Sequence, residues 1–474
     1  MTKKTIKKPY IEFCGNSAID VTGSCYHVKF QEDSILLDFG LIQTNNLVQD
    51  YKENHTKPKG VRPKEISLIL ISHSNIDHIG RIPWLYKQGC EAPIYCTYGN
   101  KDMMRLLLED SMKIMQSDAE KIHNKHGLNT SSLYDMEDII KTLDHVIEVD
   151  YQQNIVFNNN VSFKFYEAGH IVHSAQIMLT LTDGNWRKII GYTGDIGSPN
   201  LPHYYLDNIT PLPYCDYIIG EATYSAKTRN HKAKDRDVDI NKIKAVIQEA
   251  VDKKTRVLIP VFAFDRLETI LTLLYEIYNG KSPLPILVDT PLGQKIAKTW
   301  CADGTDIGRD ILWDTVRNWS DVTWIGDYAD SRLKQDSGLP YIILASSGMC
   351  TAGRSLAWLK SMLPVTNNKV MFCGYSGEGT LADDIKKGDK KYLIVDGESV
   401  KNNAGVVVLN SFSSHMCHNE LLDYYTSINY ERIYLVHSNQ ETKIEFAHEL
   451  KEKLGKVGRT SRVVVTNKDT KVYL

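Results

Sequence analysis

The sequence predicts an α/β fold in which buried strands alternate with helices, and three observations support this. The chain has 474 residues, of which 42% are hydrophobic and 24% charged, values typical of globular proteins long enough to bury a full core. Continuous runs of Val, Ile and Leu recur, as in strands buried on both faces. Helical patterns separate several of these runs. A disordered chain, a coiled coil and a collagen-like fibre are therefore excluded.

Eight apolar runs are predicted as strands, and many of them end in a polar or glycine-containing turn. In chain order they lie within residues 34–40, 66–80, 187–197, 215–224, 256–266, 339–354, 404–415 and 431–439. In open α/β sheets, ligands gather beyond the carboxyl ends of such strands. We therefore expect these strand exits to form one shared active-site rim.

Two helices and two boundary loops are predicted between the strands. Residues 99–123 place Met and Leu at roughly helical spacing, and residues 265–280 form an apolar-striped helix. Gly280 stands where a C-terminal cap of the second helix is expected. The Pro-rich and polar stretches 198–213 and 384–403 are candidate loops at domain boundaries.

Charge and cysteine usage restrict the class of protein. The chain has 56 Lys and Arg against 58 Asp and Glu, so it does not coat nucleic acid through bulk positive charge, although a local basic cleft is compatible. The nine Cys are scattered without a C-x-x-C pair, which fits a reducing cytoplasm. No apolar run approaches the ~20 residues that span a bilayer, and the basic N-terminus lacks the apolar core of a signal peptide. We expect a cytoplasmic protein that does not enter a membrane.

The most informative segment is SHSNIDHIG, which directly follows a predicted buried strand. Its two His and one Asp offer nitrogen and oxygen donors that suit Zn²⁺ or Mn²⁺. Each such side chain alone is compatible with a surface or capping role, but all of them lie at strand exits. The donors of this segment and of the other exits are His73, Asp77, His78, His170, Asp195 and His437.

These motifs resemble those of the metallo-β-lactamase superfamily, and in particular its β-CASP nucleases of the cleavage and polyadenylation specificity factor type. The resemblance runs from about residue 10 to about residue 440. The motifs of the metallo-β-lactamase core are matched by Asp38 in LLDFG, by His73, Asp77 and His78, by His170 in AGHIVHSAQ and by Asp195 in YTGDIG. The β-CASP motifs are matched by Glu221 in GEATY, His415 in FSSH and His437 in LVHSN.

The resemblance implies a metallo-β-lactamase αββα sandwich, residues 1–208 and 396–474, with an inserted α/β β-CASP domain at 209–395. It also implies two metal sites that share Asp195, with Asp38 behind the ligands. The ligands implied for the first site are His73, the residue at position 75, His170 and Asp195, and those for the second are Asp77, His78, His437 and Asp195.

Position 75 departs from the family pattern H-x-H-x-D-H, because Asn75 replaces the second His. A carboxamide oxygen is a weaker and harder donor than imidazole, so we expect a firmly held second Zn²⁺ and a weakened first site. Mn²⁺ would tolerate the amide oxygen better. Outer-shell changes already cost ~10–100-fold in affinity or activity, so a ligand change should cost at least as much. A competing interpretation is that Asn75 caps the following turn. The sequence leaves open whether Asn75 is natural or introduced.

The resemblance also assigns catalytic roles. Asp77 would orient the attacking hydroxide, and His415, oriented by Glu221, would protonate the leaving oxygen. Candidate phosphate contacts are Ser347, Gly348, Arg354 and Arg266, together with the basic stretch 227–236. For both Arg side chains a structural ion pair is an equal alternative, and the basic stretch is equally compatible with a solvated face.

The predicted function is that of a metal-dependent ribonuclease acting on single-stranded RNA. In the resembled family His437 favours RNA over DNA, and the short chain beyond it favours internal cutting, so an endonuclease is expected. The alternative is a weakened or inactive RNA-binding scaffold, in which Asn75 has removed activity. A small-molecule hydrolase ranks third, because it has no use for Glu221 and His415. A homodimer is compatible with the sequence.

Overall fold

The computed structural model describes residues 8–44, 46–200, 204–229, 233–299, 307–374, 376–377 and 379–474. The chain divides into two compact units. Unit 1 comprises Met1–Pro199, Leu206–Asn230 and Ser414–Leu474, and unit 2 comprises Asn200–Tyr205 and His231–Ser413. Among the described residues, no helix combines the length and the apolar character needed to cross a membrane.

Unit 1 contains two seven-stranded sheets. The first has the order β22-β1-β2-β3-β4-β5-β6 and the second the order β21-β20-β11-β10-β9-β8-β7. The strands of the first sheet are β1 Tyr10–Phe13, β2 Tyr26–Phe30, β3 Asp33–Leu37, β4 Leu68–Leu70, β5 Ile94–Thr97, β6 Val146–Val149 and β22 Lys471–Tyr473. Those of the second are β7 Ile155–Val156, β8 Val161–Glu167, β9 Ala175–Asp183, β10 Trp186–Tyr192, β11 Cys215–Glu221, β20 Tyr430–Val436 and β21 Arg462–Val465.

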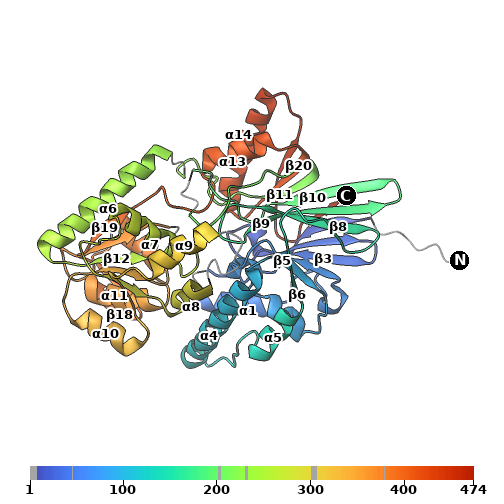
Figure 1. Ribbon diagram of the computed structural model, residues 1–474. Coiled ribbons are helices and arrows are strands. Elements are labelled where there is room, and N and C mark those ends of the chain that lie inside the picture. The colour runs from blue at the N-terminus through green and yellow to red at the C-terminus, as the bar shows by residue number, and fades with distance from the viewer. Residues whose placement is uncertain are drawn as a thin grey trace. The chain divides into compact units, whose positions relative to one another are not determined.

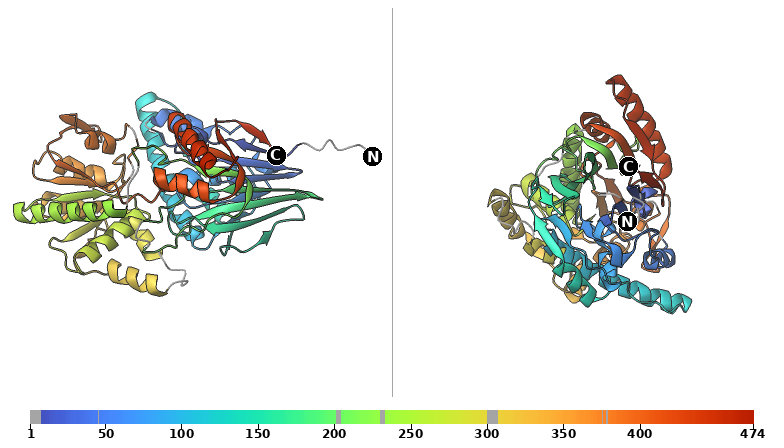
Figure 2. Two further views of the ribbon diagram at one scale, coloured as in Figure 1. Left: turned by 90° about the horizontal axis from the view of Figure 1, so that it is seen from above. Right: turned by 90° about the vertical axis from the view of Figure 1, so that its right-hand side faces the viewer.

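Helices cover the outer faces of both sheets. They are α1 Leu47–His55, α2 Ile76–Ile79, α3 Ile82–Lys87, α4 Asn100–His126, α5 Met136–Asp144, α13 His418–Ser427 and α14 Gln440–Lys456, with the 3₁₀ turns η1 Asn16–Ala18 and η2 Pro63–Glu65. Figure 1 shows α4 and α5 beside β5 and β6, and α13 and α14 beside β20. The red α13 and α14 also lie side by side in Figure 2.

Three apolar cores join these layers. Val28 and Phe163 belong to the core between the two sheets. Ile94 packs with helix α4 on the outer face of the first sheet, and Ile433 packs with α13 and α14 on the outer face of the second. Unit 1 is therefore an αββα sandwich, as predicted.

The predicted helices form, and local chemistry explains where they end. The helix expected at 99–123 is α4, which ends at Gly127 with a φ of +64°, a left-handed conformation that glycine adopts without a steric penalty. The helix expected at 265–280 is α7, Arg266–Ile277, and Gly280 closes the turn beyond it with a φ of +70°. Its amide donates to the carbonyl of Tyr275.

Unit 2 is built on a six-stranded parallel sheet with the order β14-β13-β15-β12-β16-β19 and a separate hairpin, β17-β18. Helices α6 and α11 lie on either side of β12 (Figure 1). The strands are β12 Val257–Pro260, β13 Ile286–Asp289, β14 Val322–Trp324, β15 Ile342–Ala345, β16 Lys369–Phe372, β17 Tyr392–Val395, β18 Glu398–Lys401 and β19 Gly405–Val408. The helices besides α7 are α6 Ala233–Lys253, α8 Pro291–Thr299, α9 Ile307–Arg317, α10 Tyr328–Asp336, α11 Arg354–Met362 and α12 Leu381–Lys387.

Strand pairing changes two expectations about organisation. The eight predicted strands lie in three sheets rather than in one, and β12, β15 and β19 belong to unit 2. An apolar run predicts burial, but it does not specify which sheet a strand joins. The stretch 384–403 is also not a loop, because it contains the end of α12 and the hairpin β17-β18.

The boundaries of the two units differ from those expected at 209 and 395. Strand β11 pairs with β10 and β20, which places it in unit 1. Strand β19 pairs with β16, which places it in unit 2. Each strand joins the sheet whose hydrogen bonds it completes.

Candidate metal centre

Parallel pairing brings several predicted donors to the same sheet edge. Strands β10, β11 and β20 run parallel, so the residues at their carboxyl ends lie side by side. Asp195 follows β10, Glu221 ends β11 and His437 follows β20. The turn after β4 and helix α2 supply the donors of the SHSNIDHIG segment, and the β8–β9 connection supplies His170.

Two glycines allow the loops of this edge to touch. A Cβ on Gly40 would lie 1.6 Å from the carbonyl oxygen of Asp77, and one on Gly197 would lie 1.5 Å from that of Gly169. Any larger residue would push the backbones of Asp77 and His170 away. The close loop contacts therefore depend on the absence of a side chain at both positions.

One group of donors consists of His73, His170 and Asp195. Oδ2 of Asp195 lies 3.8 Å from Nε2 of His73 and 3.8 Å from Nε2 of His170. All three side chains are buried. These are the predicted ligands of the first metal site, apart from position 75.

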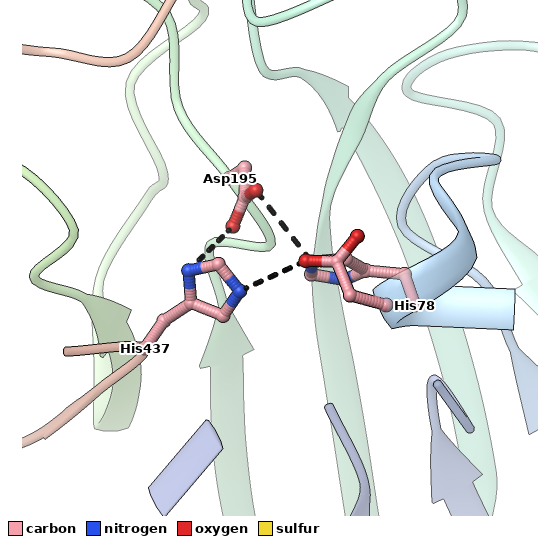
Figure 3. Close-up of side chains that lie close together, drawn as sticks. His78, Asp195 and His437 are labelled. Atoms are coloured by element: carbon pink, nitrogen blue, oxygen red, sulfur yellow. Dashed lines mark hydrogen bonds and ion pairs between the residues drawn. The ribbon is translucent and has the colours of Figure 1, made fainter. Parts of the chain in front are cut away.

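A second group consists of Asp77, His78, His437 and the same Asp195. Nε2 of His78 lies 3.5 Å from Oδ2 of Asp195 and 3.6 Å from Oδ2 of Asp77. Nε2 of His437 lies 3.3 Å from Oδ2 of Asp77, and its Nδ1 lies 3.6 Å from Oδ1 of Asp195. Figure 3 shows His78, Asp195 and His437 pointing toward one another. Asp195 is thus common to both groups.

The donor atoms fit divalent metal ions. Nε2 of His73, Nε2 of His78 and Oδ1 of Asp195 are buried and have no hydrogen-bond partner. Buried polar atoms without partners are costly, and metal coordination would satisfy them. Burial lowers the pKa values of His73 and His170, which favours the neutral imidazole that a metal requires.

Asp195 polarises the other two imidazoles. Burial lowers the pKa values of His78 and His437, but the Asp195 and Asp77 carboxylates together outweigh it, so both pKa values are raised. Burial likewise raises the pKa of Asp195, and His437 and His78 outweigh it, so that this pKa lies well below its usual range. A cation at this place is therefore electrostatically favoured.

Asp38 lies directly behind His78. Its Oδ2 accepts from Nδ1 of His78 at 2.7 Å, from the Tyr192 hydroxyl at 2.7 Å and from the Ser72 hydroxyl at 2.6 Å. Its Oδ1 accepts from the Ser72 amide at 2.8 Å. These bonds hold the imidazole with its Nε2 toward Asp77 and Asp195, as expected for a carboxylate that orients a metal-binding His.

Glu221 and His415 form a pair beside the metal donors. Nδ1 of His415 lies 3.3 Å from Oε1 of Glu221, and the His415 ring lies 4.5 Å from that of His170. Burial lowers the pKa of His415, but the Glu221 carboxylate outweighs it, so the pKa is raised. The amide of Ile196 donates to Glu221 at 2.7 Å, which fixes the carboxylate next to the Asp195 loop.

Asn75 occupies the N-cap position of α2, but its side chain makes no capping hydrogen bond. Only its backbone carbonyl serves the turn, accepting from the amides of His78 and Ile79 at 2.8 and 3.0 Å. The interpretation of Asn75 as a side-chain cap is therefore wrong. The turn keeps these two backbone hydrogen bonds whether the Asn75 side chain faces solvent or a metal ion.

The four predicted phosphate contacts lie in unit 2 and already have partners. The Arg266 guanidinium donates to the carbonyl of Phe412, and that of Arg354 donates to the carbonyl of Asp327 at 3.1 Å and lies 3.7 Å from Asp289. The Ser347 hydroxyl accepts from the amide of Thr351 at 3.2 Å. Gly348 is buried against Phe262. These contacts favour the structural alternative, and a role in RNA binding stays a prediction.

The basic stretch 227–236 lies partly outside the described residues. Of the described part, Lys227 pairs with Glu449 at 3.1 Å and the Arg229 guanidinium lies 5.0 Å from the Tyr224 ring.

Three polar side chains of the site escaped sequence reasoning: Ser72, Tyr192 and Thr223. The first two donate to Asp38, and the Thr223 hydroxyl lies 2.9 Å from Nδ1 of His437. Each is within three residues of a recognised motif residue, which is the one signal that could have found them. Hydroxyl groups are too common in turns for type alone to mark them.

Comparison with known proteins agrees with this geometry. Three family models match: the metallo-β-lactamase superfamily domain at residues 27–183, the Beta-Casp domain at 267–385 and the Zn-dependent metallo-hydrolase RNA specificity domain at 399–463. An RNase J-like protein of Methanocaldococcus jannaschii is 30% identical over 441 residues, covering 90% of this chain and 91% of that protein. The chain belongs to the β-CASP family of the metallo-β-lactamase superfamily.

Other relatives of this β-CASP protein are similar over most of its length. Ribonuclease TTHA0252 of Thermus thermophilus is 28% identical, covering 90% of this chain and 92% of that protein. The transcription termination factor FttA of M. jannaschii is 26% identical over 92% of this chain and 68% of its own length. A crystal structure of a protein of unknown function from Enterococcus faecalis shares the fold, with a TM-score of 0.52, 12% identity and coverage of 99% of this chain and 100% of that one.

Proposed function

We propose that this β-CASP protein is a metal-dependent ribonuclease that hydrolyses RNA phosphodiester bonds, by internal cutting, at a dinuclear zinc centre. The observation that carries the proposal is the pair of buried donor groups that share Asp195, with the Glu221–His415 pair beside them. Two of the related proteins are named as ribonucleases, which supports the choice of reaction. The RNA specificity domain matched at 399–463 supports the choice of substrate.

The ligand sets follow from the two donor groups. His73, His170 and Asp195 would hold the first ion, with the Asn75 amide as a weak further ligand, and Asp77, His78, His437 and Asp195 would hold the second. When bound, the two ions supply Lewis-acid stabilisation of the phosphate charge and an acidified water molecule. The mixed imidazole and carboxylate donors suit Zn²⁺, and the amide oxygen suits Mn²⁺ better.

Protein side chains would position the attacking group and handle the proton of the leaving group. Oδ2 of Asp77, 3.3 Å from Nε2 of His437, is placed to orient a water molecule by accepting a hydrogen bond from it. His415 is buried beside Glu221, whose carboxylate favours the protonated ring at neutral pH. With Nδ1–H directed at Glu221, Nε2 of His415 would give its proton to the leaving 3′-oxygen, which departs as a neutral hydroxyl.

The substrate form, the cellular location and the assembly state belong to the same proposal. We expect single-stranded RNA, because a buried centre reaches an unpaired strand more readily than a duplex. Ser347, Gly348, Arg266 and Arg354 are proposed to approach the RNA backbone. A cytoplasmic location and a homodimer complete the proposal, and light scattering of the purified chain measures the latter.

Asn75 motivates the alternative, a β-CASP protein that binds RNA without cutting it. The side chain is not used as a cap, so capping does not account for an amide at a ligand position. In this alternative the first metal site binds no ion, and the protein does not cleave RNA. The two proposals differ in their prediction for the unaltered protein, which cleaves RNA on the first and does not on the second.

The test compares the unaltered protein, Asn75→His and a control, Asn318→His, which adds a histidine at an exposed position of unit 2. Each is assayed on end-labelled single-stranded RNA with Zn²⁺ or Mn²⁺, and its metal content is measured by elemental analysis. Cleavage by the unaltered protein, increased at least ~10-fold in Asn75→His but not in Asn318→His, supports a ribonuclease with a weakened first site. Cleavage by Asn75→His alone supports the binding protein. No cleavage by any of the three refutes the ribonuclease proposal.

A further inference from the structure

The first hairpin of unit 1 carries a separate group of side chains whose types can bind metal ions, away from the motif residues. Glu12 and Cys14 on and after β1, and His27 on β2, bring a carboxylate oxygen, a thiol and an imidazole nitrogen within 4.8 Å of one another. Glu12 and Cys14 are two residues apart, and His27 pairs directly with Glu12, so all three share one face of the hairpin. None of them belongs to the catalytic motifs.

These three side chains are buried beneath the helical layer. Their exposed fractions are 2% for Glu12, 2% for Cys14 and 3% for His27. Cys14 belongs to the core between the first sheet and its helices. A Cβ on Gly60 would lie 2.2 Å from Oε2 of Glu12, so the connection between α1 and η2 closes directly over the carboxylate. The group is therefore enclosed and shielded from solvent.

Two donor atoms within the group have no partner. Oε2 of Glu12 and Nδ1 of His27 are buried without a hydrogen bond, and they lie 3.8 Å apart. That separation is too long for a hydrogen bond. It is close to the ~3.3–3.8 Å expected between two ligands of a tetrahedral zinc ion with bonds of about 2.0–2.3 Å. The other ring nitrogen of His27 lies 2.8 Å from the Ser34 hydroxyl, which directs Nδ1 toward Glu12.

Cys25 lies next to this group. It is opposite Cys14 in the continued register of β1 and β2, and the amide of Gly15 donates to its carbonyl at 2.9 Å. Cys25 is also buried in the same core as Cys14.

An ion pair alone does not account for the arrangement. Nζ of Lys471 lies 3.6 Å from Oε2 of Glu12, so it offsets part of the carboxylate charge from the edge strand β22. That contact leaves Nδ1 of His27 without a hydrogen bond and does not involve either thiol. A cation among the donors would satisfy all of them together.

We propose that Glu12, Cys14 and His27, with Cys25 as the candidate fourth ligand, form a structural zinc site that is distinct from the catalytic centre. Two thiolates, an imidazole and a carboxylate form a set with the softness and number of a closed tetrahedral zinc site. The site would clamp β1 to β2 within the hairpin. It has no open position for substrate, so its function is to stabilise the fold.

Cobalt substitution separates this site from the catalytic centre, because the two donor groups that share Asp195 contain no cysteine. The full-length protein is produced in zinc-depleted medium with Co²⁺ and kept under a reductant that prevents disulfide formation. We expect a thiolate-to-cobalt charge-transfer absorption in the near ultraviolet. The Cys14→Ser variant should lose at least about half of this absorption and roughly one equivalent of cobalt per chain. The matched control is Cys96→Ser, a buried thiol of the same core, which should keep both.

Two results would overturn the proposal. The first is cobalt bound by the unaltered protein without any thiolate absorption, a result that does not depend on the folding of a variant. Alternatively, Cys14→Ser and Cys96→Ser could show equal absorption and equal cobalt content. His27→Gln provides a further check, since removal of the imidazole should shift the absorption and leave the thiolate contribution in place.

Discussion

Replacement of Asp38 by Asn should uncouple the metal centre from the strand behind it. The carboxylate of Asp38 is fully buried and accepts four hydrogen bonds, one at Oδ1 and three at Oδ2. An amide has one accepting oxygen, so its NH₂ group must face either the Ser72 amide or the three donors at Oδ2. In the better orientation the amide oxygen replaces Oδ2, so only the bond from the Ser72 amide is lost. The negative charge that holds the His78 imidazole is lost in either orientation.

The cost can be worked from these contacts. A lost hydrogen bond to a charged group costs about 1.5–3 kcal/mol, and the buried Ser72 amide left without an acceptor adds about 1–3 kcal/mol. We expect Asp38→Asn to lower the free energy of unfolding by about 2.5–6 kcal/mol, the sum of the two. Since the Asp38 carboxylate orients His78, metal affinity should fall by ~10–100-fold.

The assay combines urea unfolding of the metal-free protein with titration of Zn²⁺ by isothermal calorimetry. Asp33→Asn is the matched control, because Asp33 begins β3, the strand that Asp38 follows, is partly exposed and accepts one bond, from Asn158 at 3.0 Å. A loss of under about 1 kcal/mol is expected there. If Asp38→Asn matches this control in both stability and zinc affinity, the positioning role of Asp38 is refuted.

Three further predictions follow from single residues. His415→Ala should slow RNA cleavage by ~10²–10⁴-fold with unchanged metal content, and an unchanged rate would remove His415 from the proton transfer. Gly197→Ala should lower the melting temperature and the metal content, because its Cβ would lie 1.5 Å from the carbonyl oxygen of Gly169. The control is Gly455→Ala in helix α14, whose Cβ would meet nothing within 4 Å and which should stabilise the protein by up to about 1 kcal/mol. Burial raises the pKa of Asp265 from 3.8 to about 6, so the folded state binds the extra proton and stability falls as pH rises from about 4 to 6. Asn tolerates the local φ of +69°, so Asp265→Asn is a suitable variant. Between pH 4 and pH 7 its free energy of unfolding, measured by urea titration, should rise by about 3 kcal/mol relative to that of the unaltered protein. An equal pH dependence of the two proteins would contradict the raised pKa of Asp265.

Much of the site could be predicted from the sequence because metal donors follow strands in short motifs. His73, Asp77 and His78 lie within one turn, so local spacing alone brings them together. Asp195 and His437 come together because β10 and β20 lie in the second sheet, but they meet Asp77 and His78 only because the end of β4 in the first sheet lies against that edge. Tyr192 and Thr223 were missed because a hydroxyl has no distinctive spacing.

The predicted phosphate contacts show the opposite case. Arg266 and Arg354 follow predicted strands and were equally compatible with RNA binding and with structural pairing. Only the tertiary structure supplied Phe412 and Asp327 as their acceptors, which come from segments 146 and 27 residues away along the chain. A sequence pattern does not specify such partners, because it carries no information about which distant carbonyl lies within reach.

The amino-acid sequence by itself determined the α/β class, the family resemblance and the identity of the donors, including the departure at Asn75. These depend on residue type and on periodicity, which act over a few neighbours. Only the tertiary structure decided that the eight strands lie in three sheets, with β11 in unit 1 and β19 in unit 2. It also decided that Glu12, Cys14 and His27 form a further group of donors. The physical reason is that strand pairing and burial under a distant loop are set by long-range hydrogen bonds and packing, which local periodicity does not encode.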